Sequence, residues 1–183
     1  MSPSRHGFWV VDTVAYTHLA RANHLDLLHR LAPEGVIVVP AEVSREIEAG
    51  REGYAAIPSI SALSWAQLVV LDDNEEWTKL LVKAQLAGKP DEHLGECAVI
   101  AVSKHRSGVA IIDDRAARKQ AEANGVECLD TLWIVVEAYK TLLNGDRNEA
   151  AAVVDDLLAT QMYLLIRSGE ELFAWAYEEG ILP

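Results

Sequence analysis

The chain has 183 residues, of which half are apolar and 24% are charged, and its formal net charge is −12. This length fits one domain with a sizeable core. The acidic balance excludes recruitment to nucleic acid or to an anionic membrane by the net field alone, although a local basic patch stays open. We find no signal-peptide pattern and no run long enough to span a bilayer, so we expect a cytoplasmic protein with no membrane partner.

Short apolar runs alternate with helical patterns along the chain. The apolar runs predict five strands, at 7–11, 35–39, 65–71, 109–112 and 126–129. Apolar residues at helical spacing predict helices at 16–31, 41–50, 74–88, 91–108, 115–125 and 131–145. Strands that alternate with helices indicate an α/β fold with three layers, in which helices cover both faces of a central, mostly parallel sheet.

The end of the chain, at 149–180, is predicted to form a C-terminal pair of helices. We find no internal repeat, no low-complexity tract and no linker that would mark a second domain. Residues 1–183 are therefore expected to form one domain.

Carboxylates gather where the predicted strands end and the next helices begin. In a parallel sheet, the usual ligand crevice lies beyond the carboxyl ends of the strands. The acidic residues at this edge are Asp12, Glu42, Glu46, Glu96, Asp113 and Asp114. Clustered carboxylates repel one another unless cations neutralise them, and their oxygen atoms suit Mg²⁺ or Mn²⁺. Such ions would activate water and stabilise the charge that develops in phosphodiester cleavage.

Each acidic position also has a purely structural explanation. Asp114 precedes a helix and is suited to accept its free N–H groups as an N-cap. Glu42 and Glu46 lie four residues apart, and both are compatible with a solvated helix face. Glu96, in a first helical turn, is favoured there by the helix dipole. The metal-site hypothesis therefore depends on several of these side chains meeting.

A basic segment follows the acidic pair, and its members are Arg115, Arg118 and Lys119. These cations either contact a nucleic-acid backbone or form surface pairs with neighbouring carboxylates. Cys97 and Cys128 lie in apolar contexts without metal-ligand spacing, so we predict reduced, buried thiols.

The acidic motifs occur in an order that resembles the PIN-domain nucleases, especially the toxin-like VapC branch. The motifs are VVDT (10–13), VVPAEVSREI (38–47), LGECAVIAVS (94–103) and IIDDRAARKQA (111–121). The resemblance covers about residues 8–143 and is weaker in the C-terminal helices.

The resemblance implies roles for individual residues. The implied catalytic set is Asp12, Glu46, Glu96 and Asp114. The implied metal ligands are Asp12, Glu96, Asp113 and Asp114, with Asp114 slightly favoured over Asp113 as the fourth acid. The auxiliary residues are Thr13, Glu42 and Asp130, and the residues expected to contact nucleic acid are Arg115, Arg118 and Lys119.

By the same resemblance we expect an endoribonuclease that depends on Mg²⁺ or Mn²⁺, acts as the toxin of a toxin–antitoxin pair, forms a homodimer and is held inactive by a small antitoxin protein. The alternative is a catalytically inactive PIN-like module that binds protein or RNA. An enzyme with a nucleophilic aspartate is less favoured, because the double-aspartate phosphatase motif needs a second Asp two residues after the first and Val14 follows Asp12 there.

Overall fold

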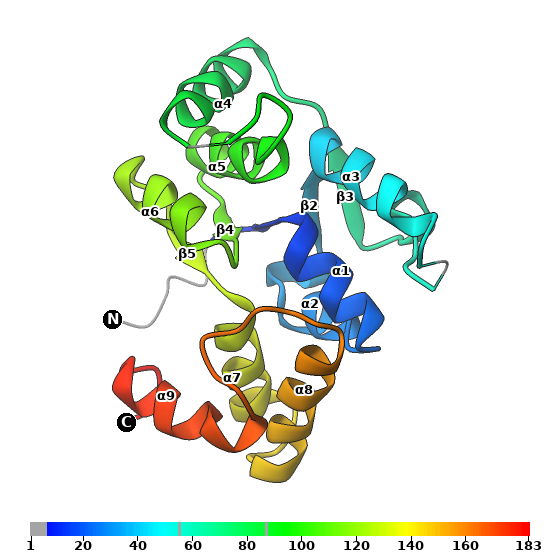
Figure 1. The fold of residues 1–183 in the computed structure, drawn as a ribbon, viewed down its shortest axis with the longest axis vertical. Helices are drawn as coiled ribbons and strands as arrows, with labels where there is room; N and C mark the ends of the chain where they lie inside the picture. The colour runs from blue at the N-terminus through cyan, green and yellow to red at the C-terminus, as the bar shows by residue number, and fades with distance from the viewer. Residues whose placement is uncertain (1–6, 55, 87) are drawn as a thin grey trace.

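A computed structural model describes residues 7–54, 56–86 and 88–183 (Figure 1). In these ranges five strands form one sheet in the order β3-β2-β1-β4-β5, and each neighbouring pair is parallel. The strands are β1 (Trp9–Val11), β2 (Ile37–Pro40), β3 (Ala66–Val69), β4 (Val109–Ile111) and β5 (Cys128–Leu129). The predicted three-layer α/β fold is confirmed.

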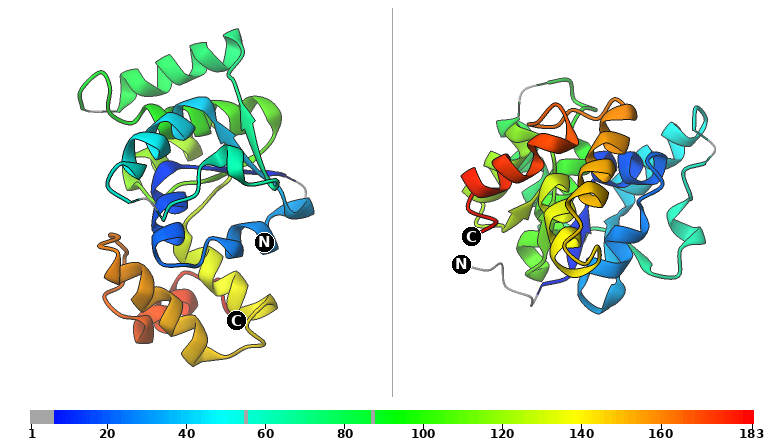
Figure 2. Two further views of the ribbon diagram at one scale, coloured as in Figure 1. Left: turned by 90° about the vertical axis from the view of Figure 1, so that its right-hand side faces the viewer. Right: turned by 90° about the horizontal axis from the view of Figure 1, so that it is seen from below.

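Helices lie on both sides of this sheet (Figures 1 and 2). They are α1 (Thr13–Arg21), α2 (Asp26–Leu31), α3 (Ala41–Arg51), α4 (Asp73–Gln85), α5 (Leu94–Arg106), α6 (Arg115–Ala123), α7 (Thr131–Thr141), α8 (Arg147–Ala159) and α9 (Leu172–Glu178). Helix α5 packs on β1, β2 and β4 and is covered by α4, whereas α7 packs against α2 and α8. Within the described ranges, no helix is both long and apolar enough to cross a bilayer.

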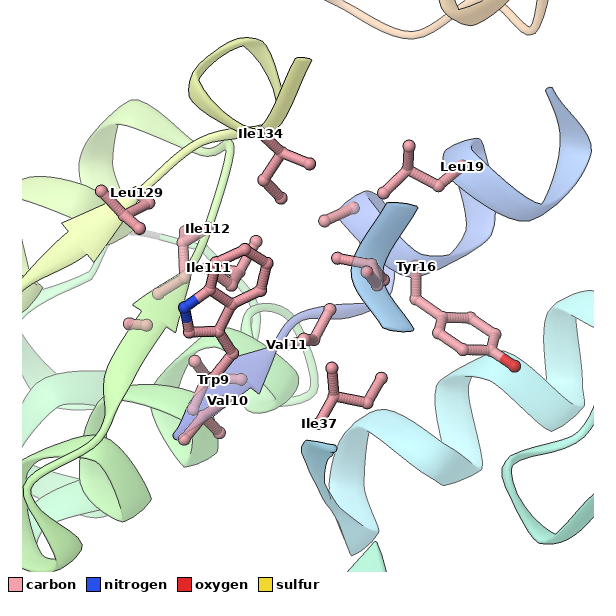
Figure 3. Packing of buried hydrophobic residues seen from close by; sticks show 14 of the residues in the cluster. Trp9, Val10, Val11, Tyr16, Leu19, Ile37, Ile111, Ile112, Leu129 and Ile134 are labelled. Atoms are coloured by element: carbon pink, nitrogen blue, oxygen red, sulfur yellow. The ribbon is translucent and has the colours of Figure 1, made fainter. Parts of the chain in front are cut away.

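The central strands are apolar throughout because both of their faces are covered. Every residue of β1, β2 and β4 is buried, as expected for parallel strands between two helical layers. Trp9 of β1 packs edge-to-face against Trp133 of α7, with 6.1 Å between ring centroids. Figure 3 shows Trp9 with Ile111, Leu129 and Ile134 in the core between the sheet and the helices.

The predicted helix at 16–31 is wrong in its extent, because the structure divides this segment into α1 and α2. The chain turns at Asn23, whose φ of 61° is left-handed, a conformation that asparagine tolerates better than most residues. Helix α1 also begins earlier than predicted, at Thr13. Asp12 therefore stands at the exact junction between β1 and a helix.

Strand order places the ends of β1 and β4 next to each other. The Asp12 backbone N–H donates to the carbonyl of Ile111, at 3.1 Å, which continues the ladder one residue beyond the strand. The residues that follow both strands thus emerge at one edge of the sheet, and the fold itself brings Asp12 close to Asp113.

Candidate functional site

Asp12 is the most deeply buried acid at this edge, with 1% of its surface exposed. Its Oδ1 accepts the Ala15 backbone N–H at 2.8 Å and so caps α1. Its Oδ2 is also shielded from solvent and makes no hydrogen bond with the described residues, although the Asp113 backbone N–H lies close enough to the carboxylate to lower its pKa. Burial first, and then the negative charges of Asp113 and Glu96, raise the pKa of Asp12 well above its usual value.

Asp113 is held by the first residue of α7. Its Oδ1 accepts the Thr131 backbone N–H at 2.9 Å, and its Oδ2 accepts the Thr131 hydroxyl at 2.7 Å. Burial raises the pKa of Asp113 to about 6, although both hydrogen bonds from Thr131 oppose this change. The carboxylate is therefore fixed in direction and remains close to Asp12.

Asp114 has a different position. It is the N-cap of α6, and its Oδ1 accepts the Ala117 backbone N–H at 2.8 Å. A side chain that caps a helix turns back onto the free N–H groups of its own first turn. Capping alone does not exclude a ligand role, because Asp12 caps α1 in the same way. The charge of Asp113 raises the pKa of Asp12, and the metal roles of Asp113 and Asp114 both stay predictions.

Glu46 joins α3 to the beginnings of α1 and α5. Its Oε2 accepts the Thr13 hydroxyl, and its Oε1 accepts the Gly95 backbone N–H at 3.0 Å. A Cβ atom at position 95 would lie only 2.6 Å from Oε2, so glycine is needed for this close approach. Burial raises the pKa of Glu46, and the charge of Glu96 adds to this effect.

Glu96, in the first turn of α5, connects the two halves of the acidic cluster. Its charge raises the pKa of both Asp12 and Glu46, because its carboxylate lies near each of them. His93 Nδ1 lies 3.5 Å from Glu96 Oε1. Asp12, Glu46, Glu96 and Asp113 therefore form one acidic cluster at the carboxyl edge of the sheet.

Two predicted auxiliary acids are held by cations instead. Glu42 accepts a hydrogen bond from Lys79 Nζ at 2.8 Å, and both side chains are largely buried, at 8% and 12% exposed. Asp130 caps α7 by accepting the Trp133 backbone N–H at 2.8 Å, and it also pairs with Arg118. Both acids lie at the border of the cluster with part of their charge compensated.

The basic residues of α6 divide into two kinds. Arg118 is partly buried and bound to Asp130. Arg115 and Lys119 are exposed on the surface of the helix. Of the three cations predicted to contact nucleic acid, Arg115 and Lys119 are therefore open to solvent, whereas Arg118 is paired with Asp130.

The two cysteines do not supply a nucleophile at this site. Burial raises the pKa of Cys97 to about 11 and that of Cys128 to about 12. Both thiols therefore stay protonated at neutral pH, and the thiolate is the reactive form.

The acidic cluster does not form a closed metal site in this structure. In the described part of the chain, no three His, Cys, Asp or Glu side chains lie together so that they could hold a metal ion. The buried, unpartnered Oδ2 of Asp12 is nevertheless a hard oxygen ligand beside Asp113 and Glu96. Magnesium commonly takes only one or two protein carboxylates and keeps several waters, so a complete protein cage is not required.

A comparison with family models identifies the family of this chain. A model described as the PIN domain matches residues 8–174. The chain belongs to the PIN-domain family. PIN domains have a nuclease-type fold and are typically nucleases that use divalent metals, which agrees with an acidic cluster at the carboxyl edge of the sheet. A search of curated proteins finds no match.

Two contributors to the acidic cluster were not identified from the sequence, Thr131 and the backbone N–H of Gly95. A signal for Thr131 was present, because the pair Asp-Thr occurs at both 12–13 and 130–131. In each pair the threonine hydroxyl donates to an acid from a different element, Glu46 in one case and Asp113 in the other. The role of Gly95 depends on contact between α3 and α5, which no local pattern shows.

Proposed function

We propose that this PIN domain is an endoribonuclease that depends on Mg²⁺ or Mn²⁺. The observation that carries the proposal is the buried Oδ2 of Asp12, which has no donor among the described residues and lies beside two further carboxylates. Leaving a buried polar atom without a partner costs free energy, and a cation would compensate both this atom and the repulsion around it.

In this proposal, some side chains of the cluster would hold the cation and another would accept a proton. Asp12, Asp113 and Glu96 would hold the cation, which when bound activates water and stabilises charge on the phosphate. Glu46 has a raised pKa and a direction set by the Thr13 hydroxyl and the Gly95 N–H. It would accept the proton from the attacking water, because a carboxylate with a raised pKa is the better base near neutral pH.

The surface around the cluster supports RNA as the substrate. Arg115 and Lys119 are exposed on α6, which begins directly after Asp114. Phosphate groups would meet these cations, while the net charge of −12 would keep affinity low and sensitive to salt.

The biological role proposed is that of a VapC-like toxin. Here the strongly acidic chain would be held inactive by a small basic antitoxin and would act as a homodimer in the cytoplasm. The acidic surface supports a basic inhibitor, because opposite charges accelerate and direct association.

The test is cleavage of a panel of single-stranded and structured RNAs by purified protein with Mg²⁺, with Mn²⁺ and with EDTA. We expect metal-dependent cleavage that falls at least about a hundredfold in Asp12→Asn. Asp146→Asn is the matched control, because Asp146 is the exposed N-cap of α8 outside the acidic cluster and asparagine caps a helix about as well as aspartate, so its cleavage should equal that of the wild type. Equal cleavage by wild type and Asp12→Asn would contradict the proposal.

The alternative is an inactive module that binds RNA or protein. The finding that no three potential ligands among the described residues could hold a metal ion favours it. It predicts RNA binding that is unchanged by EDTA and no cleavage by the wild type under any metal condition.

A further inference from the structure

A cavity of about 210 Å³ lies between α9 and the region where α6, β5 and α7 meet. Its wall includes Arg118, Asp130, Trp133, Leu165, Trp175 and Glu179. Ordinary small-molecule sites span roughly 300–1,000 Å³, so this cavity is the size for a single ring system. The part of the wall formed by Trp175 and Glu179 contains no residue of the acidic cluster.

The cavity adjoins the acidic cluster through Asp130 and Thr131. Asp130 lines the cavity, pairs with Arg118 and caps α7. The next residue, Thr131, donates two hydrogen bonds to Asp113. A group bound in the cavity would therefore lie only a few residues from the proposed cleavage centre.

One side chain of this wall, Arg118, has hydrogen-bond donors open to a ligand. The guanidinium of Arg118 binds Asp130 through Nη1, and for the described residues no acceptor is found for its Nε or Nη2. Trp175 is 8% exposed, and its indole N–H is buried without an acceptor in the described ranges. This N–H has almost no accessible surface, so Trp175 contributes the face or edge of its ring to the cavity, and the open donors of the wall are those of Arg118.

The remaining wall is apolar and aromatic except for one carboxylate. Trp133, Leu165 and Trp175 offer flat or apolar surface, while Glu179 offers an acceptor. The cavity therefore combines stacking surface, a guanidinium held by Asp130 and a second carboxylate, that of Glu179. Unpaired RNA bases are recognised by this combination of aromatic stacking and hydrogen bonds to the base edges.

We propose that this cavity binds one unpaired guanine base of the substrate, next to the scissile phosphate. Arginine pairs with the O6 and N7 acceptors of guanine, and a carboxylate accepts from its N1 and N2 donors. Adenine presents a donor in place of O6, and pyrimidines fill less of the space. The inference rests on the proposed function in one respect, namely that the substrate is RNA.

The test observes binding without cleavage. The protein has five tryptophans, so its indole N–H groups give five resonances that can be assigned with Trp→Phe variants. Guanosine, adenosine, cytidine and uridine 5′-monophosphates are titrated in EDTA. We expect GMP to shift the Trp175 resonance at a concentration at least about fivefold lower than the other nucleotides, which carry the same phosphate.

Three controls make the result specific. Glu179→Gln keeps the shape of the wall and removes its charge, so GMP affinity should fall to that of AMP. Leu165→Phe, at an exposed position, narrows the cavity and should weaken all four nucleotides. Trp77, which is 67% exposed on α4, should not shift. Unchanged indole resonances in each nucleotide-free variant would verify its fold.

The proposal is overturned if no nucleotide moves the Trp175 resonance, if all four move it equally, or if Glu179→Gln has no effect. Failure of the proposed function gives a different result. If the protein binds GMP here but cleaves no RNA, the proposed base site stands and the proposed nuclease function fails. If the protein cleaves RNA but does not bind GMP here, only the proposed base site fails.

Discussion

Replacing Asp113 by asparagine should stabilise the fold while weakening the site. The ionised carboxylate is held beside Asp12 in the acidic cluster, and burial raises its pKa from 3.8 to about 6. A raised pKa in the folded protein means that folding penalises the charged form. The amide of asparagine is uncharged, and its oxygen and nitrogen still offer hydrogen bonds to the N–H and hydroxyl of Thr131.

The magnitude follows from the pKa change. About two pKa units correspond to roughly 3 kcal/mol at 1.36 kcal/mol for each unit. Asp113 is partly exposed and is coupled to a second acid, so we expect about 1–2 kcal/mol of stabilisation at neutral pH. For a chain of this length, such a gain raises the Tm by about 2–8 °C.

The pH dependence of unfolding tests the sign of this stability change. The penalty is present in full above the folded pKa of about 6 and disappears below the unfolded value of 3.8. Wild-type stability should therefore fall as pH rises between these values, relative to Asp113→Asn. Urea unfolding of both proteins in EDTA, at about pH 5 and about pH 7.5, measures this difference.

Asp114→Asn is the control for the preceding experiment. It keeps the cap of α6 and loses only the interaction of a negative charge with the helix dipole, so it should destabilise by about 0.3–1 kcal/mol. The reasoning is refuted if Asp113→Asn destabilises the protein at neutral pH, or if its advantage is the same at both pH values.

Three further outcomes are expected. Gly95→Ala should push the Glu46 carboxylate away from the α5 N-terminus and reduce RNA cleavage by about 10–100-fold, with unfolding free energy changed by less than about 1 kcal/mol because alanine favours the helix. Lys79→Met should leave the buried Glu42 with only the exposed Arg45, 3.5 Å away, as a counter-charge and cost about 2–3 kcal/mol in urea unfolding, and adding Glu42→Gln should restore most of this loss. Mn²⁺ at a hundred times its Kd should raise the unfolding free energy of the wild type by about 2.7 kcal/mol, and EDTA should reverse the gain, whereas a Tm unaffected by Mn²⁺ would contradict the site.

The edge of the sheet at which the acids meet could be predicted from the sequence. Apolar runs that end in Asp12 and in Asp113 indicate buried parallel strands, and parallel strands end at one edge of a sheet. The adjacency of β1 and β4 then brings both acids together. This part of the prediction depends on patterns within single elements and on a general rule of topology.

The contacts of the individual acids could not be predicted in the same way. Whether Asp113 or Asp114 faces Asp12 depends on backbone angles at the start of α6, and both residues have the same chemistry in sequence. The pairing of Glu42 with Lys79 joins residues 37 positions apart on different helices. No local periodicity reports a contact of that kind.

The break between α1 and α2 had a different cause. Apolar residues continue at helical spacing through Leu19, Leu25 and Leu28, and this pattern predicts one helix. The left-handed turn at Asn23 interrupts the helix while both parts keep their apolar faces on the core. Hydrophobic spacing alone does not detect such a turn.

Calorimetric titration of Mn²⁺ into the metal-free protein tests the central claim most directly, with wild type and Asp12→Asn measured side by side. The account predicts saturable binding to the wild type and an affinity at least about tenfold weaker in Asp12→Asn, because the unpartnered Oδ2 would be a direct ligand. Absence of binding to the wild type, or equal affinities for the two proteins, would contradict a metal centre built on Asp12.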